Sequence, residues 1–345
     1  MIRVWFNKTF SSVHSALTLI REGDVAGEFR LVCSSPNPHA LALLAADEAA
    51  AEPSGVTGAD YIDWCLTFCE KRQIAIFVPG KEASLVARHR QAFLERGVKV
   101  LSAAEPDVLD LLHDKARFYE TARAATAPSP DVAEFDSLST FDNAYKRMRA
   151  RHPVLCMKPS VSVYGIGFRQ ILETKSAFDL MLDGNPYRID LQSLREMLER
   201  AGDFRPMLLM PFLAGHEFSV DCVAYEGTLV CGVARRKSLS AGGGQRIVVR
   251  EGIQRACADL VTQFRLNGNV NIQFREVTEG LCDEGLRVLE INPRMSGGIG
   301  MACLAGPNLP YLALATFVHG PSAVQVPPIE DGLRVGEINR AVRLP

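Results

Sequence analysis

A strand that ends in a proline and a cluster of glycines, near the carboxyl end of the chain, constrains the fold more than any other feature. The run Leu286–Asn292 predicts a strand that places Glu290 and Asn292 on one face, because side chains two residues apart point the same way. Pro293 ends this strand, and three glycines within 297–300 then let the backbone approach another group closely. A carboxylate and an amide therefore sit on a strand that runs directly into a close-approach loop.

A second strand is predicted for Asn269–Arg275, where apolar and polar side chains alternate. Its polar face carries Asn271 and Gln273, and the polar, glycine-bearing stretch 276–285 that follows is typical of a hairpin connection. An antiparallel hairpin would bring Gln273 beside Glu290 and its neighbour on the same face. Amide oxygens and a carboxylate together make a hard-oxygen site suited to Mg²⁺, or Mn²⁺, shared with substrate phosphates. The alternative, on the pattern alone, is an ordinary hairpin with a solvated polar face.

These two strands resemble a known family. Asn271-Ile-Gln-Phe274 and Leu289-Glu-Ile-Asn-Pro-Arg294 are similar to the metal-binding end of the ATP-grasp superfamily, particularly its carbamoyl-phosphate-synthetase-like and biotin-carboxylase-like branch. Bacterial proteins associated with tellurite-resistance and stress clusters look like the nearest relatives. The resemblance implies ATP as a ligand and a metal held by Gln273, Glu290 and Asn292. It also implies an α/β fold: an N-terminal open parallel sheet, the pre-ATP-grasp domain, followed by a two-subdomain ATP-grasp fold that is α+β in its C-terminal part.

Composition agrees with an enzyme of this size. The 345 residues suit two or three domains, and 47% hydrophobic with 23% charged residues is typical of a soluble globular protein. A formal net charge of -2 without a long basic run argues against a nucleic-acid partner. The nine cysteines are scattered, as expected for reduced, buried thiols. With no signal peptide and no run that could span a bilayer, we expect a cytoplasmic protein without a membrane partner.

The first third of the chain alternates apolar strands with helical segments, which predicts an open parallel sheet with ligands near the carboxyl ends of its strands. An alanine-rich segment that extends through Ala51 consists of good helix formers and is expected to be helical. The predicted strands are Ile2–Phe6, Leu31–Cys33, Ile74–Val78 and Val98–Leu101, and further helices are predicted at Tyr61–Lys71 and Leu85–Arg96.

A dinucleotide-binding oxidoreductase is the competing interpretation of this third. The turn Asn7–Ser12 after the first strand lacks the close-approach glycines that a dinucleotide requires. Lys8, Thr9 and Ser11 could still hold an anion at the start of the following helix, although an ordinary polar turn is equally consistent. Because the Pro79–Glu82 turn would face the catalytic cleft of an ATP-grasp protein, Lys81 is a candidate for contact with the acceptor substrate.

Nucleotide-binding candidates follow in the order that the family has them. Lys115 opens a helix that Asp114 can cap, and in the superfamily a basic residue at this point reaches the nucleotide phosphates. Lys158 ends an apolar strand and precedes a Ser/Gly loop, which can meet phosphate oxygens with charge and backbone N–H groups together. By resemblance this loop is the flap that closes over ATP. Its candidate ATP-binding residues are Ser160, Tyr164, Gly165 and Gly167.

The hinge of the family falls at residues 207–217. By resemblance, backbone groups of Met210, Pro211, Phe212 and Leu213 hydrogen-bond the adenine edge, and Glu217 accepts from the ribose hydroxyls. Many members have an acidic residue where this chain has Pro211.

Basic residues and glycines mark the acceptor side. Arg235, Arg236 and Lys237 form a tight basic triplet, one member of which is expected to contact the γ-phosphate or the carboxylate substrate. A charged surface hairpin is the alternative. Arg294 is the stronger candidate because it follows the metal strand. The acceptor-side candidates are Arg235, Lys237, Gly243, Gly297, Gly298 and Lys81, and the catalytic ones are Arg294, Lys158 and Arg236.

The expected domains are 1–112, the pre-ATP-grasp domain, and 113–320, the ATP-grasp domain. The latter divides into a nucleotide lid at about 120–206 and a metal and acceptor subdomain at 207–320. Residues 321–345 are expected to form a covering segment.

By resemblance, the activity is that of a carboxylate–amine ligase that forms an acyl phosphate and an amide-type bond and releases ADP and phosphate. Small-molecule carboxylate and amine substrates are therefore expected, and a homodimer is possible for the family. The alternatives are an ATP-binding regulatory or scaffold protein without turnover and a carboxylate–thiol ligase.

Overall fold

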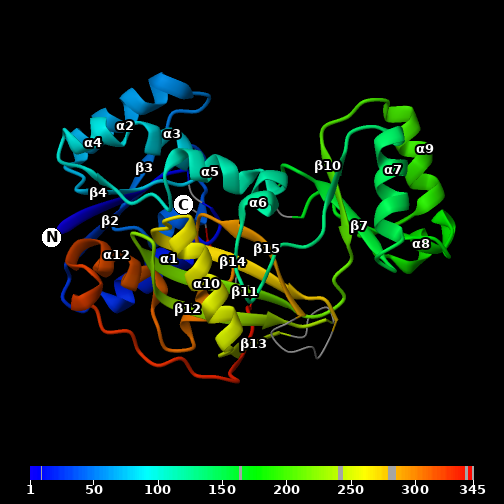
Figure 1. Ribbon diagram of the computed structural model, residues 1–345. Helices are drawn as coiled ribbons and strands as arrows, with labels where there is room; N and C mark the ends of the chain where they lie inside the picture. Colours follow the sequence, from blue (N-terminus) through cyan, green and yellow to red (C-terminus); the bar gives the residue numbers. More distant parts are fainter. Residues whose placement is uncertain (9, 163–164, 240–243, 279–284, 339–340, 344–345) are drawn as a thin grey trace.

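Three β-sheets organise the chain. The computed structural model describes residues 1–8, 10–162, 165–239, 244–278, 285–338 and 341–343. Two sheets lie side by side in a body, and the other, with its helices α7, α8 and α9, stands apart at the right of the view (Figure 1). No helix among these residues is long and apolar enough to cross a membrane.

The first sheet has the predicted parallel architecture. Its strand order is β3-β2-β1-β4-β5, and every neighbouring pair is parallel. Because β1 lies between β2 and β4, the loops after β1 and β4 meet at the carboxyl edge of the sheet, where the Gly80 amide donates to Asn7 Oδ1 at 2.8 Å. The strands are β1 Ile2–Phe6, β2 Phe29–Ser35, β3 Glu48–Ala51, β4 Ile76–Val78 and β5 Lys99–Val100, with helices α1 Val13–Gly23, α2 Gly58–Arg72, α3 Ala83–Arg88 and α4 Arg90–Leu94.

The prediction of a helix in the alanine-rich segment is wrong. Only Leu41–Ala45 forms a short 3₁₀ turn, and the residues that follow form β3, which pairs with β2. The carboxylate of Asp47 accepts from the Leu31 amide of β2 at 2.7 Å and pairs with Arg21 at 2.8 Å. These tertiary hydrogen bonds hold the segment at the sheet edge, and helix propensity alone is a weaker preference.

The second sheet has the order β6-β10-β7-β8-β9 and carries its own apolar core against α7 and α9. Its helices begin at side-chain caps: Ser137 and Thr140 form a capping box at α7, and Asp190 caps α9. β10, which follows α9, pairs with β6 and β7, so this sheet extends to Pro211. The elements are β6 Ala133–Phe135, α7 Leu138–Arg149, β7 Leu155–Pro159, β8 Arg169–Leu172, α8 Ala177–Asp183, β9 Arg188–Asp190, α9 Leu191–Ala201 and β10 Met207–Pro211.

The third sheet is antiparallel throughout, with the order β15-β14-β11-β12-β13-β16. Its apolar face packs under α10 and against α5 and α6 in one buried core. The tail supplies β16, which pairs with β13 at the sheet edge. The elements are α5 Pro106–His113, α6 Lys115–Thr121, β11 Glu217–Tyr225, β12 Thr228–Lys237, β13 Gln245–Val248, α10 Glu251–Gln263, β14 Gly268–Glu276, β15 Leu286–Asn292, α11 Ile299–Cys303, α12 Leu309–His319 and β16 Arg334–Val335.

Candidate active site

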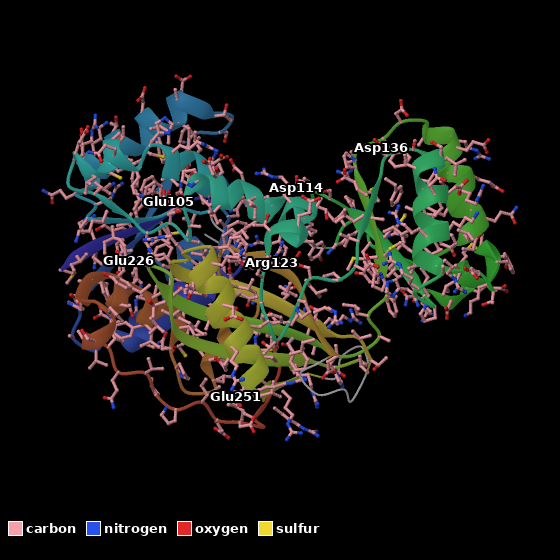
Figure 2. All side chains as sticks on the ribbon, viewed as in Figure 1. Glu105, Asp114, Arg123, Asp136, Glu226 and Glu251 are labelled. Carbon is pink, nitrogen blue, oxygen red and sulfur yellow. The ribbon has the colours of Figure 1, made fainter. Side chains whose placement is uncertain are left out.

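A cavity of about 860 Å³ lies where the three sheets meet, within the size range of small-molecule sites. Residues of the loop after β1, of β7 and β8, of the β10–β11 hinge and of the polar face of the third sheet all line it. Asp114, at the start of α6, lies on the side of the body that faces the second sheet (Figure 2).

The predicted hairpin of the polar strands is confirmed. β14 and β15 are antiparallel, with Gln273 opposite Glu290 and Asn271 opposite Asn292. The Asn292 amide nitrogen donates to Glu290 Oε1 at 3.0 Å, so the amide oxygen of Asn292 remains for another partner. Gln273, Glu290 and Asn292 all line the cavity.

A buried ion pair fixes the orientation of the Gln273 amide. Asp221 pairs with Arg235 at 2.9 Å, both side chains being at most 2% exposed, and its other oxygen accepts from the Asn271 amide nitrogen at 3.1 Å. The Asn271 oxygen therefore points away from Asp221 and accepts from the Gln273 amide nitrogen at 3.3 Å. In consequence the amide oxygen of Gln273, like that of Asn292, is left for a cation.

Lys115 sits at the first turn of α6, behind the predicted cap. Asp114 accepts hydrogen bonds from the amides of Ala116 and Arg117 and from the Ser160 hydroxyl. The ammonium of Lys115 donates to the Ser162 carbonyl at 2.7 Å and lies 3.7 Å from Glu290. Burial lowers the pKa of Lys115 despite the opposing charge of Glu290, so this lysine is poorly solvated and suited to an anion.

Lys158, at the end of β7, is held by Tyr119. Its ammonium donates to the Tyr119 hydroxyl at 2.7 Å, and that hydroxyl donates to the Leu289 carbonyl of β15 at 2.7 Å. Tyr119 is thus a bridge between the lysine and the strand that carries Glu290. Burial lowers the pKa of Lys158, and the charge of Glu290 opposes that shift.

Glu290 lies among these cations. Burial alone would raise the pKa of its carboxyl, but Lys115, the Asn292 amide, Lys158 and Arg294 together lower it. The carboxylate is therefore ionised at neutral pH.

The described part of the loop after β7 lies against the cavity. The Ser160 carbonyl accepts from the Lys115 amide at 3.0 Å, and Gly165 lines the cavity. Gly165 and Gly167 have positive φ angles of 67° and 85°, which favour glycine. Tyr164 lies outside the described residues.

The hinge residues Met210, Pro211, Phe212 and Leu213 line the cavity together. Glu217, at the start of β11, forms an ion pair with Lys237 of β12 and lies 3.8 Å from Arg275 of β14. All three charged residues also line the cavity.

The basic triplet on β12 is divided between the two faces of the sheet. Arg235 and Lys237 point to the polar face, whereas Arg236 pairs with Phe218 in register and lies on the side that packs under α10. Arg235 is buried, and besides Asp221 its guanidinium donates to Ser219 Oγ at 3.1 Å and to Ser296 Oγ at 2.9 Å. It is thus engaged with the protein itself.

The remaining candidates lie around the loop after β15. A Cβ on Gly298 would come within 2.5 Å of the Arg235 guanidinium, so a larger residue there would have to displace that buried side chain. Gly297 and Arg294 line the cavity, and the Arg294 guanidinium lies 4.8 Å from the ring centre of Phe10. Lys81 does not line the cavity, and Gly243 lies outside the described residues.

Comparison with known proteins identifies the fold that surrounds this cavity. A family model described as "ATP-grasp in the biosynthetic pathway with Ter operon" matches residues 203–341. An N5-carboxyaminoimidazole ribonucleotide synthetase in complex with ADP superposes with a TM-score of 0.64 over 96% of this chain and 80% of that one, at 10% identity. The chain has the ATP-grasp fold. The family resemblance expected from the sequence, and with it the fold class, is confirmed.

Two further ATP-grasp structures show the same likeness. An L-amino acid ligase from Bacillus licheniformis has a TM-score of 0.61 at 12% identity, over 92% of this chain and 74% of that one. The biotin carboxylase domain of a Hydrogenobacter thermophilus 2-oxoglutarate carboxylase, with MgADP and bicarbonate, has a TM-score of 0.61 at 14% identity, over 92% and 69%. A comparison with curated proteins finds no match to the sequence.

The residues of this ATP-grasp cavity fit a hard divalent cation. The nitrogens of both amides are engaged, so the oxygens of Gln273 and Asn292 are left beside the ionised carboxylate of Glu290. Oxygen donors of this kind suit Mg²⁺. Among the described residues no three histidine, cysteine, aspartate or glutamate side chains gather as a metal site, and here one carboxylate is joined by two amides.

Sequence reasoning missed Tyr119, Asn271 and Phe10. Tyr119 follows Lys115 by four residues, a spacing that puts both on one face of a helix, but nothing in the sequence says that this face meets β7. Asn271 was placed on the polar face without a role, and its link to Asp221 depends on strand pairing.

Proposed function

We propose that this protein is an ATP-dependent carboxylate–amine ligase. It would form an acyl phosphate from ATP and a carboxylate and then an amide-type bond, with release of ADP and phosphate. The observation that carries the proposal is that Lys115, Lys158 and the oxygens of Gln273, Glu290 and Asn292 converge on one cavity. The likeness to an L-amino acid ligase and to an N5-carboxyaminoimidazole ribonucleotide synthetase supports the same class of reaction.

In this proposal the nucleotide lies along the hinge. Backbone groups of Met210–Leu213 hydrogen-bond the adenine, and Glu217 accepts from the ribose hydroxyls. Lys115, Lys158 and backbone groups at Ser160, Gly165 and Gly167 bind the phosphates. Lys158 has three N–H donors, so it keeps its bond to Tyr119 and still reaches phosphate oxygens.

Gln273, Glu290 and Asn292 would hold magnesium, which supplies charge neutralisation on the phosphates when bound. A carboxylate oxygen of the substrate attacks the γ-phosphorus, and the bond from that phosphorus to ADP breaks. An amine nitrogen then attacks the acyl carbon, phosphate leaves, and the amine gives up a proton. Lys115, Lys158 and Arg294 stabilise the negative charge that develops on the phosphoryl group. We assign no role to Arg236, which lies on the opposite face of β12.

The test is release of ADP and phosphate from Mg-ATP in the presence of pooled carboxylates and amines. Hydroxylamine is added as a trap, because it converts an acyl phosphate to a hydroxamate. ADP, phosphate and hydroxamate that appear only with certain carboxylates would support the proposal. AMP and pyrophosphate would contradict it, and ATP binding without turnover in every pool would favour a regulatory protein. A thiol instead of an amine as the productive acceptor would indicate a carboxylate–thiol ligase.

Removal of the single carboxylate should abolish this turnover. Glu290→Gln keeps the shape of the side chain but removes the charge that offsets three neighbouring cations, and we expect turnover to fall by about 10²-fold or more. The matched control is Glu199→Gln on the exposed face of α9, which should leave turnover unchanged. Normal turnover by Glu290→Gln would remove the basis for this metal assignment.

A further inference from the structure

The polar face of the third sheet gives the ATP-grasp cavity an order along its length. At the hinge, Glu217 of β11 lies opposite Arg275 of β14. Two residues back along β14, Gln273 lies opposite Glu290 of β15, and a rise of about 3.4 Å per residue separates these positions by roughly 7 Å. One more step of two residues along β15 reaches Asn292. The cavity therefore leads from the proposed ribose site at Glu217, past the metal-site residues, to the loop after β15.

The end of the cavity beyond the metal-site residues, which we call the acyl end, is where the proposed reaction would occur. In that reaction the γ-phosphate lies at the metal-site residues and is transferred away from ADP. The acyl phosphate therefore forms on the side away from the hinge. From the loops after β1 and β15 and from the last turn of α5, the residues that line the cavity are Phe10, Ser11, Leu112, His113, Arg294 and Met295.

His113 is the last residue of α5 and, within the described part of the chain, the one histidine that lines the cavity. The chain places it beside the phosphate-binding groups, because Lys115 opens α6 two residues later and lies 3.7 Å from Glu290. α5 also packs against β15, and the charge of Arg294, just after β15, acts on the His113 ring. His113 therefore lies at the acyl end.

The imidazole ring of His113 is available to a ligand. It makes no hydrogen bond or ion pair with any residue that the structure describes, and its side chain is partly accessible to water. In contrast, a ring nitrogen lies at hydrogen-bond distance from an oxygen in four other histidines, which are His89, His152, His216 and His319. A neutral imidazole has one nitrogen without a proton, so this ring can take a proton in the cavity and pass it to water.

His113 is neutral at pH 7 in the ligand-free protein. Burial lowers the pKa of its ring below the ordinary value of 6.5, the charges of Arg294 and Lys115 lower it further, and Asp110 opposes them. The ring is thus in the form that accepts a proton.

Acidic groups near this ring have partners of their own. The elements that pack against α5 are α3, α6 and β15. Asp110 pairs with Arg88 of α3. Glu290 of β15 lies 3.7 Å from Lys115 of α6, and Asp114 accepts hydrogen bonds from amides in the first turn of α6. The positive charges therefore outweigh the negative ones at the ring, in agreement with its neutral form.

We propose that His113 is a catalytic residue that accepts a proton from the amine substrate during amide formation. This inference rests on the proposed ligase function and deepens it, because it assigns the base of the second step. An alkylamine is mostly an ammonium ion at pH 7 and has no lone pair with which to attack. A base at the acyl end removes that obstacle next to the acyl carbon.

The step balances in protons and electrons. His113 takes one proton from the ammonium, and the lone pair that this frees on nitrogen forms the bond to the acyl carbon. The bond from that carbon to the phosphate oxygen breaks, and phosphate leaves with the second proton of the nitrogen. The amide keeps the third hydrogen of a primary amine, and the imidazolium releases its proton to water.

The test compares two acceptors that differ in basicity. Each carboxylate that gives hydroxamate in the ligase assay is used with hydroxylamine in one reaction and with the pooled amines in another. Hydroxylamine is a weak base that is mostly unprotonated at pH 7, so its attack does not wait for a proton acceptor. We expect His113→Gln to lower amide formation by about 10²-fold or more and to leave hydroxamate formation unchanged.

His39→Gln is the matched control, because His39 is exposed and lines neither cavity that the structure describes. It should form both products at the rate of the wild type. Both variants should keep the unfolding temperature of the wild type, since the His113 ring has no hydrogen bond to lose among the described residues.

The pH dependence of kcat for amide formation gives a second readout. In the wild type, kcat should fall as the pH drops through the pKa of His113, because a protonated ring cannot accept a proton, and it should level off above that pKa. In His113→Gln, kcat should instead keep rising above pH 7 in proportion to the unprotonated fraction of the amine. The same profile in both proteins would refute the role of His113.

These outcomes separate the role of His113 from the proposed function. Normal amide formation by His113→Gln would refute that role while the ligase stands. An equal loss of amide and hydroxamate would also refute it, because His113 would then act in the ATP-dependent first step. Absence of hydroxamate from the wild type with every carboxylate would contradict the ligase, and hydroxamate without any amide would contradict an amine acceptor. Either of these last two results would remove the role of His113 as well.

Discussion

Tyr119 should act on ATP binding through Lys158, and Tyr119→Phe isolates that effect. The substitution removes one oxygen and keeps the ring, which is 4% exposed and packed in the main core. Lys158 loses the acceptor that lies 2.7 Å from its ammonium, and the Leu289 carbonyl loses its donor at 2.7 Å. The lysine would then be free to leave the position that the bridge to β15 defines.

The magnitude follows from the charge and burial of this hydrogen bond. A hydrogen bond to a charged group contributes about 1.5–3 kcal/mol, which corresponds to a loss of about 10- to 150-fold in affinity. We therefore expect the Kd for Mg-ATP, measured by calorimetric titration, to rise by at least tenfold. The unpaired Leu289 carbonyl should lower the free energy of unfolding by about 1 kcal/mol as a separate effect.

A pH profile distinguishes positioning from general loosening. The hydroxyl oxygen stabilises the protonated amine, so its removal should lower the pKa of Lys158 further, and ATP affinity should decline at a lower pH than in the wild type. Tyr145→Phe is the control, since its hydroxyl donates to Glu173, the residue after β8, outside the cavity. If both variants bind Mg-ATP equally, or if the alkaline limb does not move, the bridging role of Tyr119 is refuted.

Two further predictions concern the charges of the cavity. Gln273→Glu gives the cation site a second carboxylate, and the charge of the ligands sets cation affinity. We therefore expect Mn²⁺ to bind at least about tenfold more tightly than in the wild type, measured by electron paramagnetic resonance without nucleotide. The control Gln192→Glu on α9 should leave the Mn²⁺ affinity unchanged. Burial lowers the pKa of Lys158 below its ordinary value of 10.5. The unfolded chain therefore binds more protons between the two pKa values, and the stability of the ligand-free protein should rise with pH in that interval. Urea unfolding should show this rise in the wild type and a smaller one in Lys158→Met; equal slopes would contradict the shift.

The sequence was most informative where side-chain alternation and chain order determine the outcome. A period of two fixes which residues share a strand face, so Gln273 could be expected beside Glu290 and Asn292, and the structure adds the register that puts it opposite Glu290. Alternation of strands and helices likewise predicted the parallel first sheet. The alanine-rich segment before Ala51 failed because Asp47 and the edge of β2 hold it in place, and such tertiary contacts are invisible in local propensity.

The basic triplet shows a second reason why the sequence alone does not predict the role of each residue. Alternation along the strand is enough to separate Arg236 from Arg235 and Lys237. Whether Arg235 contacts substrate or protein depends on Asp221, fourteen residues earlier on the neighbouring strand, and that partner becomes apparent only from the register of β11 and β12. A buried arginine paired with a buried aspartate serves the geometry of the site, since it orients Asn271 and through it Gln273.

The electrostatics of the cavity connect these residues to ATP. Lys115 and Lys158 are buried enough for their pKa values to be lowered, and Glu290 opposes both shifts. The charged groups that lower the pKa of Glu290 are Lys115, Lys158 and Arg294, and positive charges gathered in this way favour an anion in the cavity. Burying unneutralised charge destabilises the ligand-free protein, and a triphosphate would relieve that penalty as it binds. Gln273 and Asn292 are neutral ligands. A cation would therefore enter this site together with the nucleotide, because the phosphates provide the additional negative charge.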